Sequence, residues 1–122
     1  MTVLVVDDTD SARDIAARIL RHSGMDVVGA QSGPEALTIL EGFTPDLILL
    51  DLAMPEMDGL TLLERLREHP RWADIPVVML SAVCDEQTIQ RAFRLGAREY
   101  LVKAGFSAPQ MLEVVRQHAR QS

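Results

Sequence analysis

The sequence predicts an α/β fold, in which a five-stranded parallel sheet is doubly wound and carries helices on both faces. Three observations lead to this prediction. Five short apolar runs alternate with five segments of helical periodicity along the 122 residues, the connections between them are short, and two of the apolar runs end directly in aspartates. Regular alternation of this kind is typical of a parallel sheet that is covered by helices on both sides.

The apolar runs that we interpret as strands are short and almost uninterrupted. Such runs are typical of strands buried on both faces, because helices cover each side of a parallel sheet. We expect strands at residues 2–6, 26–30, 46–50, 75–80 and 99–102. Right-handed crossovers leave few topologies, and we expect the flavodoxin-like strand order 2-1-3-4-5.

The first two helical segments have clear boundaries. Apolar residues recur at three- and four-residue spacing between residues 10 and 22, and Gly24 ends this helix. Its apolar positions are Ala12, Ile15, Ala16, Ile19 and Leu20. A capping box from Ser32 to Glu35 opens the second helix, which ends near Gly42.

Three further helical segments follow the same pattern. The third helix ends before Pro70 and the fourth ends before Gly96. A second capping box, from Ser107 to Gln110, opens the fifth helix. The apolar positions are Leu60, Leu63 and Leu66 in the third helix, Ile89, Ala92, Phe93 and Leu95 in the fourth, and Met111, Leu112, Val114 and Val115 in the fifth.

Composition and charge narrow the class of protein. Residues 1–122, with 48% hydrophobic and 25% charged residues, are enough for one domain with its own core. A net charge of −6 argues against a general nucleic-acid or membrane surface, which would need an excess of basic residues. The single cysteine, Cys84, excludes an internal disulfide, and no signal-peptide or membrane-span pattern is present, so we expect a cytoplasmic protein.

Carboxylates follow two of the expected buried strands. The run "TVLVV" ends in Asp7 and Asp8, and "LILL" ends in Asp51. In the expected order the first and third strands are neighbours at the point where the winding reverses, so these three acids face one crevice. Their charges repel unless a cation lies between them. Mg²⁺ prefers oxygen ligands and often shares a site with a phosphate, so the crevice indicates a Mg²⁺ site beside a phosphoryl group.

Two further side chains are expected at the same edge of the sheet. "VVMLS" places Ser81 at the end of the fourth strand, and "YLVK" places Lys103, the only lysine of the chain, at the end of the fifth. A hydroxyl donor and a compact cation opposite the acids would stabilise the charge of a transferring phosphoryl group.

These four motifs together carry a family resemblance. "LVVDD", "LILLDLAMPEMDG", "VVMLSA" and "YLVK" occur in this order, each at a predicted strand end. The whole chain resembles a response-regulator receiver domain, the phosphoacceptor module of two-component signalling. The resemblance implies a phosphorylation-activated switch rather than a turnover enzyme. It also implies a sensor histidine kinase or phosphotransfer protein as phosphodonor, a downstream effector protein or domain, and a dimer that depends on phosphorylation.

The resemblance also implies roles for individual residues. Asp51 would accept the phosphoryl group from a phosphohistidine. Asp8, Asp51 and the backbone carbonyl of Ala53 would coordinate Mg²⁺ or Mn²⁺, and Asp7 would act through a metal-bound water. Ser81 and Lys103 would stabilise the phosphoryl group.

The resemblance further implies residues that switch the output surface and residues that set the lifetime of the phosphoryl group. Ser81 and Tyr100 would form the switch that alters an output surface on the fourth helix, fifth strand and fifth helix. Ala53 and Val83, two residues past Asp51 and Ser81, would tune the lifetime of the phosphoryl group. Receiver domains usually carry proline after the lysine, where this chain has Ala104, so a cis or a trans bond at Lys103–Ala104 stays open.

Three other functions remain open alternatives for this sequence. "DDTDS" is similar to the first motif of haloacid-dehalogenase-like phosphohydrolases, which form an aspartyl phosphate, but such an enzyme needs an acidic cluster where Ser81 stands and leaves Asp51 without a role. A flavodoxin-like FMN binder would be repelled by Asp7 and Asp8. A receiver-fold scaffold without phosphotransfer is the remaining alternative.

Overall fold

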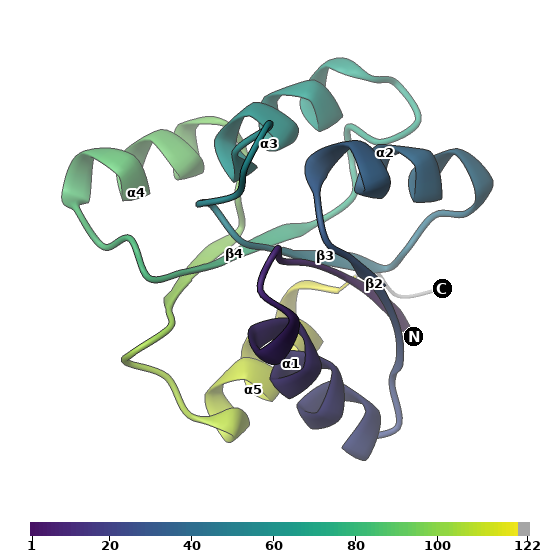
Figure 1. Cartoon of the computed structure of the whole chain (residues 1–122), viewed down its shortest axis with the longest axis vertical. Helices are drawn as coiled ribbons and strands as arrows, with labels where there is room; N and C mark the ends of the chain where they lie inside the picture. The colour runs from purple at the N-terminus through teal and green to yellow at the C-terminus, as the bar shows by residue number, and fades with distance from the viewer. Residues whose placement is uncertain (120–122) are drawn as a thin grey trace.

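The computed structural model describes residues 1–119 and contains one five-stranded parallel sheet (Figure 1). The strands are β1 (Thr2–Val6), β2 (Asp26–Ala30), β3 (Leu47–Leu50), β4 (Val77–Ser81) and β5 (Glu99–Val102). Their order is β2-β1-β3-β4-β5, and each neighbouring pair is parallel. The predicted fold class and strand order are therefore confirmed.

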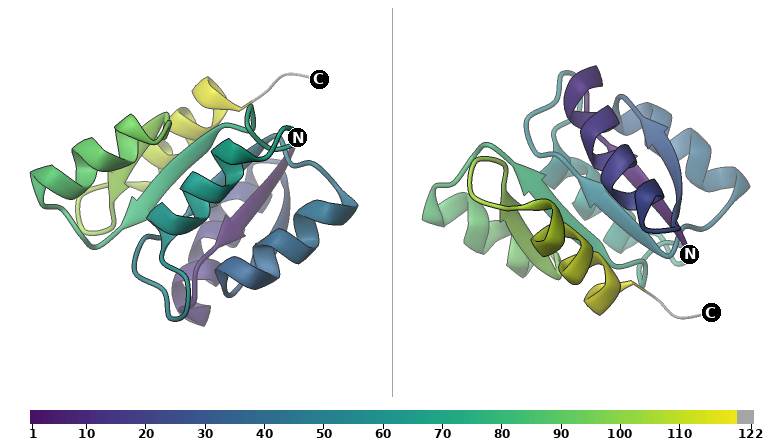
Figure 2. Two further views of the ribbon diagram at one scale, coloured as in Figure 1. Left: turned by 90° about the horizontal axis from the view of Figure 1, so that it is seen from above. Right: turned by 90° about the horizontal axis from the view of Figure 1, so that it is seen from below.

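Five helices cover the two faces of the sheet. They are α1 (Asp10–His22), α2 (Gly33–Gly42), α3 (Gly59–Glu68), α4 (Glu86–Arg94) and α5 (Ala108–His118). Helices α2, α3 and α4 lie on one face, and α1 and α5 lie on the other (Figures 1 and 2). None of the helices within residues 1–119 has the length and apolarity that a membrane crossing requires.

Strand side chains alternate between two apolar clusters, one on each face of the sheet. The cluster under α2, α3 and α4 takes Leu4, Val6, Ile48, Leu50, Val77 and Met79, and the cluster under α1 and α5 takes Val3, Val5, Leu47, Leu49, Val78 and Leu80. All four residues of β3 are buried. Because both faces of the central strands are dry, a charged side chain can join the sheet at low cost only where a strand ends.

Most helix ends follow the sequence signals. Gly24 and Gly96 adopt φ values of +88° and +101°, which L side chains rarely adopt, and they end α1 and α4 as expected. Ser107 and Gln110 form a complete capping box at α5. The predicted box at α2 is half formed: the Ser32 side chain accepts the Glu35 N–H, and no reciprocal bond accompanies it within the described structure.

Two sequence expectations need correction. Strand β4 spans Val77–Ser81 rather than residues 75–80, since the Ile75 N–H donates to the Trp72 carbonyl in a turn and the Ile75 carbonyl accepts a hydrogen bond from Arg67. The periodic positions Ile15 and Phe93 are not core residues, since 57% and 44% of their surfaces are exposed. Each lies at the margin of its helix's apolar stripe, and periodicity alone does not show where that stripe ends.

Arg67 ties three segments of the fold together. Its Nη1 donates to the carbonyls of Ala73 and Ile75 at 3.0 and 2.9 Å, and its Nη2 donates to the carbonyl of Gly96 at 3.0 Å. A Cβ at Gly96 would lie 2.7 Å from Arg67 Nε, so this glycine also makes room for the guanidinium. Burial lowers the pKa of Arg67, and the charge of Arg98 lowers it further. The arginine thus joins α3 to the segments that lead into β4 and β5.

We predict that Arg67→Met lowers the free energy of unfolding by about 2–4 kcal/mol, because three partly buried carbonyls lose a charged donor. Urea unfolding followed by circular dichroism measures this change. Arg65→Met is the matched control, since Arg65 is exposed on the same helix and should shift stability by less than about 0.5 kcal/mol. Equal effects of the two substitutions would contradict a stabilising role for the three hydrogen bonds of Arg67.

Candidate functional site

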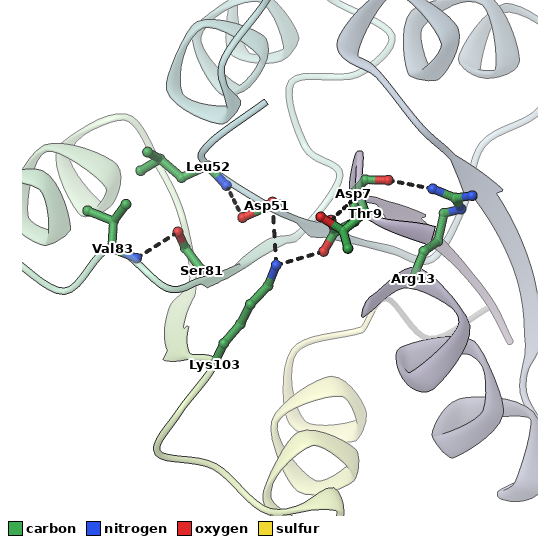
Figure 3. Close-up of polar contacts among 8 residues, drawn as sticks. All are labelled: Asp7, Thr9, Arg13, Asp51, Leu52, Ser81, Val83 and Lys103. Carbon is green, nitrogen blue, oxygen red and sulfur yellow. Dashed lines mark hydrogen bonds and ion pairs between the residues drawn. The ribbon is translucent and has the colours of Figure 1, made fainter. Parts of the chain in front are cut away.

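Polar side chains gather at the carboxyl edge of the sheet. Asp7 directly follows β1, Asp51 follows β3, Ser81 ends β4 and Lys103 follows β5. The strand ladder continues into the site, because the Asp51 N–H donates to the Val6 carbonyl at 2.9 Å and the Lys103 N–H donates to the Ser81 carbonyl at 2.9 Å. The backbone of the sheet therefore fixes where each of these side chains begins, and Figure 3 shows them converging.

Three carboxylates form an acidic cluster. One oxygen from each of Asp7, Asp8 and Asp51 lies within 4.8 Å of the others. Asp7 and Asp51 are 3% and 5% exposed, whereas Asp8 is open to solvent. Oxygen donors at this spacing, with one open side, suit a hard divalent cation that keeps several waters. The predicted grouping of Asp7, Asp8 and Asp51 is confirmed, and the metal itself stays a prediction.

Lys103 bridges the two buried acids. Its Nζ lies 3.0 Å from Asp7 Oδ2 and 3.5 Å from Asp51 Oδ2 (Figure 3). Burial by itself lowers the pKa of Lys103, but the hydrogen bond to Asp7 and the charge of Asp51 outweigh it, so the net pKa is raised. The ammonium group is therefore charged throughout the neutral range. The shorter distance is to Asp7, which makes Asp7 its main counter-ion.

Asp51 is held in an unfavourable environment for a carboxylate. Burial raises its pKa, and the nearby Asp7 raises it further. The charge of Lys103 and a 2.8 Å hydrogen bond from the Leu52 N–H to Asp51 Oδ1 lower it, without reversing the net effect. A further positive charge beside Asp51 would relieve this conflict.

Asp7 uses both of its carboxylate oxygens. Asp7 Oδ1 accepts the Thr9 N–H at 2.9 Å, and Asp7 Oδ2 contacts Lys103. The carboxylate is thus fixed by two donors from different segments. Its predicted contact with the metal through a water stays a prediction.

The segment after Asp51 folds back over the strand end. The Gly59 N–H donates to the Leu52 carbonyl at 2.7 Å, and a Cβ on Gly59 would lie 2.2 Å from the Asp51 carbonyl oxygen. Only glycine fits this approach. Glu56, at the tip of this segment, has a φ of +68°, which is uncommon for a residue with a side chain. Gly59 ends the motif "LILLDLAMPEMDG", but the sequence pattern alone does not reveal this steric role.

Ser81 and Tyr100 meet through Val83. Ser81 is fully buried, and its Oγ accepts the Val83 N–H at 3.1 Å. The Tyr100 hydroxyl donates to the Val83 carbonyl at 2.6 Å. Burial raises the pKa of Tyr100, which keeps this hydroxyl protonated and able to donate. The peptide bond between Lys103 and Ala104 is trans, so the question that the sequence left open is answered.

Residues 3–116 match the response regulator receiver domain family. The chain belongs to this family. It is 42% identical over 103 residues to an uncharacterised 14.6 kDa protein of Leptolyngbya boryana, covering 84% of this chain and 79% of that protein. It is also 40% identical over 114 residues to the DNA-binding dual master transcriptional regulator RpaA of Synechocystis, covering 93% of this chain and 47% of RpaA.

Solved receiver structures share the whole fold. The chemotaxis protein CheY4 of Vibrio cholerae superimposes with a TM-score of 0.89 at 29% identity, covering 96% of this chain and 97% of that one. The BeF3-activated N-terminal receiver domain of Klebsiella pneumoniae RstA gives a TM-score of 0.90 at 29% identity, covering 99% and 100%. The protein therefore contains a receiver domain of the kind found in two-component systems.

The raised pKa of Asp51 predicts a pH-dependent stability. Between its unfolded-state and folded-state pKa values the folded protein binds more protons, so the free energy of unfolding falls as pH rises through this window. Without divalent cations, Asp51→Asn should therefore be more stable than the parent at neutral pH. The advantage should shrink as pH falls through the folded-state pKa of Asp51.

Urea unfolding between pH 4 and pH 8 tests this, with the buffer range chosen to bracket the usual carboxyl region. Asp14→Asn, which removes an exposed acid of α1, is the control and should change stability little. An Asp51→Asn protein that is less stable than the parent at every pH would contradict the electrostatic description.

Proposed function

We propose that this receiver domain is a phosphorylation-activated signalling switch whose phosphoacceptor is Asp51. The observation that carries the proposal is the position of Asp51: it is buried at the end of β3, grouped with Asp7 and Asp8, and contacted by Lys103 at 3.5 Å. Asp51 accepts a hydrogen bond from the Leu52 N–H, yet its pKa stays raised by burial and by Asp7, which supports a role for this carboxylate with an added cation and phosphoryl group.

The transfer needs no general base. A carboxylate oxygen of Asp51 forms a bond to the phosphorus of a phosphohistidine while the bond from phosphorus to the histidine nitrogen breaks. The electron pair of that bond stays on the imidazole, which then takes up a proton. The product is an acyl phosphate on Asp51. Carboxylates are ionised at neutral pH, so the requirement is charge stabilisation rather than activation.

The acidic cluster suits Mg²⁺ or Mn²⁺. Asp8, Asp51 and the backbone carbonyl of Ala53 would hold the ion, and Asp7 would contact it through a water. When bound, the ion supplies positive charge to the phosphoryl oxygens. Lys103 would supply a second positive charge, since its Nζ already contacts Asp7 at 3.0 Å and Asp51 at 3.5 Å.

We further propose that the Ser81 hydroxyl turns to donate to the phosphoryl group. This would release the Val83 N–H, which now donates to Ser81 Oγ. Tyr100 would respond, because its hydroxyl is bound to the carbonyl of the same Val83. All four residues of β5 are partly exposed and Phe93 on α4 is 44% exposed, which supports an output surface on α4, β5 and α5.

A protein phosphodonor has an apolar surface to approach beside the site. Lys103 borders a small cavity lined mainly by apolar side chains of α1, β4 and α5, among them the exposed Ile15, together with the half-buried Phe106 from the segment before α5. A sensor histidine kinase or phosphotransfer protein is the proposed donor, and an effector protein or domain, or a phosphorylation-dependent dimer, is the proposed output. A net charge of −6 supports neither direct nucleic-acid nor membrane binding.

A receiver-fold scaffold that never accepts a phosphoryl group is the second candidate. A turnover phosphohydrolase has less support. Asp51 groups with Asp7 and Asp8 as a possible metal ligand, and a phosphohydrolase that uses Asp8 as its nucleophile would leave Asp51 without a role. The test must therefore separate phosphorylation on Asp51, phosphorylation on Asp8, and no phosphorylation.

We predict that acetyl phosphate with Mg²⁺ adds one phosphoryl group to the parent protein, because the small donor needs only the site itself. Intact mass spectrometry detects the adduct. Omitting Mg²⁺ or introducing Asp51→Asn should abolish it, and Asp14→Asn is the matched control that should retain it.

The other outcomes decide between the alternatives. No adduct with any phosphodonor would favour the scaffold. An adduct that survives Asp51→Asn but disappears in Asp8→Asn would favour the phosphohydrolase-like chemistry.

We also predict that the phosphorylated form decays over minutes rather than seconds with Mg²⁺ present. Ala53 and Val83 carry side chains that cannot hold an attacking water by a hydrogen bond. The loss of the adduct with time measures this. Ala53→Asn, at an exposed position, should shorten the lifetime by presenting a polar side chain. Decay of the parent within seconds would contradict the role of these two positions.

A further inference from the structure

Arg13 reaches the acidic cluster from outside it. It lies on α1 with its side chain only 19% exposed. Its Nη1 donates to the backbone carbonyl of Asp7 at 2.7 Å (Figure 3). That carbonyl belongs to the peptide group that links Asp7 to Asp8, so the contact is made with the backbone between two acids of the cluster.

The Asp7–Asp8 peptide lies just beyond the regular sheet. Strand β1 ends at Val6, and the last contact that continues its ladder is the 3.0 Å hydrogen bond from the Asp7 N–H to the Ala30 carbonyl. A peptide group is planar, so a donor that fixes its carbonyl also fixes the direction in which the next residue leaves. The next residue is Asp8, the exposed acid of the cluster.

The route of the Arg13 side chain is built by two other residues. Its stem crosses β2 at Gly29, where a Cβ would lie 3.2 Å from Arg13 Cδ and 3.5 Å from Arg13 Nε. Its Nη2 forms an ion pair with the exposed carboxylate of Asp10. Because Gly29 has no side chain, the aliphatic part of Arg13 can pass over β2 at this position. Asp10 binds Nη2 of the guanidinium, and Nη1 is free to donate to the Asp7 carbonyl.

We propose that Arg13 is a positioning residue for the metal site, acting through the Asp7–Asp8 peptide on the carboxylate of Asp8. The inference rests on the proposed binding of Mg²⁺ at Asp8 and Asp51. The buried acids Asp7 and Asp51 are already fixed by hydrogen bonds from Thr9 and Leu52. Asp8 is the exposed member, and its backbone is what Arg13 orients. Asp10 neutralises part of the charge of Arg13, so Arg13 acts on the site chiefly by orienting the Asp7–Asp8 peptide.

The test is the Mg²⁺ affinity of the unphosphorylated protein, measured by isothermal titration calorimetry with the metal alone. Arg13→Met should weaken Mg²⁺ binding about 10-fold, as loss of a group that orients a metal ligand typically does. Gly29→Val should weaken it in the same direction, because it displaces the arginine without removing it. Arg18→Met, an exposed arginine of the same helix, is the control and should leave the affinity unchanged.

A double-mutant cycle distinguishes positioning from general destabilisation. If Arg13 acts through Asp8, then Arg13→Met should cost little further affinity in an Asp8→Asn background, so the two losses are not additive. Thermal unfolding in the absence of Mg²⁺ identifies any variant that fails to fold. Should Arg13→Met be one, Gly29→Val combined with Asp8→Asn completes the same cycle.

Each outcome has one meaning. Non-additive losses support the positioning role. Additive losses, or parent-like affinity in both Arg13→Met and Gly29→Val, overturn that role while leaving the proposed metal site intact. Absence of Mg²⁺ binding by the parent protein overturns the proposed metal site and this inference together.

Discussion

The ammonium group of Lys103, lying between the carboxylates of Asp7 and Asp51, is the contact on which the site depends. Both acids are almost fully buried, and three carboxylates crowd one edge of the sheet. The charge of Lys103 reduces the repulsion between these carboxylates but does not remove it, since the pKa of Asp51 remains raised by its burial and by Asp7. A site that is partly but not fully neutralised is suited to take up a cation and then a phosphoryl group.

The fold creates this edge from ordinary packing. Helices on both faces leave the central strands apolar throughout, so charge collects where the strands end. Parallel pairing of β1 with β3 sets Val6 beside Leu50, and the following residues, Asp7 and Asp51, therefore meet. Gly59 lets the next segment close over Asp51, because any Cβ there would collide with the strand end. The register that pairs β1 with β3 in the core therefore also brings Asp7 and Asp51 together at the site.

The sequence was sufficient for features that depend on local pattern. The strands, their order and the convergence of Asp7, Asp8 and Asp51 follow from apolar runs and from the rule that parallel strands end at one edge. Arg13 and Arg67 could not be found this way, because each acts on backbone carbonyls of residues that sequence alone does not place nearby. The exposure of Ile15 could not be predicted for the same reason. Periodicity gives the direction of a helix face, while the neighbouring elements decide how much of that face is covered.

The proposed link from the site to the output surface passes through Val83. Val83 donates its N–H to Ser81 Oγ and accepts the Tyr100 hydroxyl at its carbonyl, so the proposed turn of the Ser81 hydroxyl would release the N–H of the residue that holds the tyrosine. A local hydrogen-bond exchange of this kind is how a small charge event would reach the proposed output surface.

The most direct test of this account is to locate the phosphoryl group chemically. Borohydride reduces an aspartyl phosphate to homoserine, so the protein treated with acetyl phosphate and Mg²⁺ can be reduced, digested and sequenced by mass spectrometry. If Asp51 is the phosphoacceptor, homoserine should appear in place of Asp51 and at no other aspartate. Homoserine at Asp8, or none after a phosphoryl adduct has been detected, would contradict it.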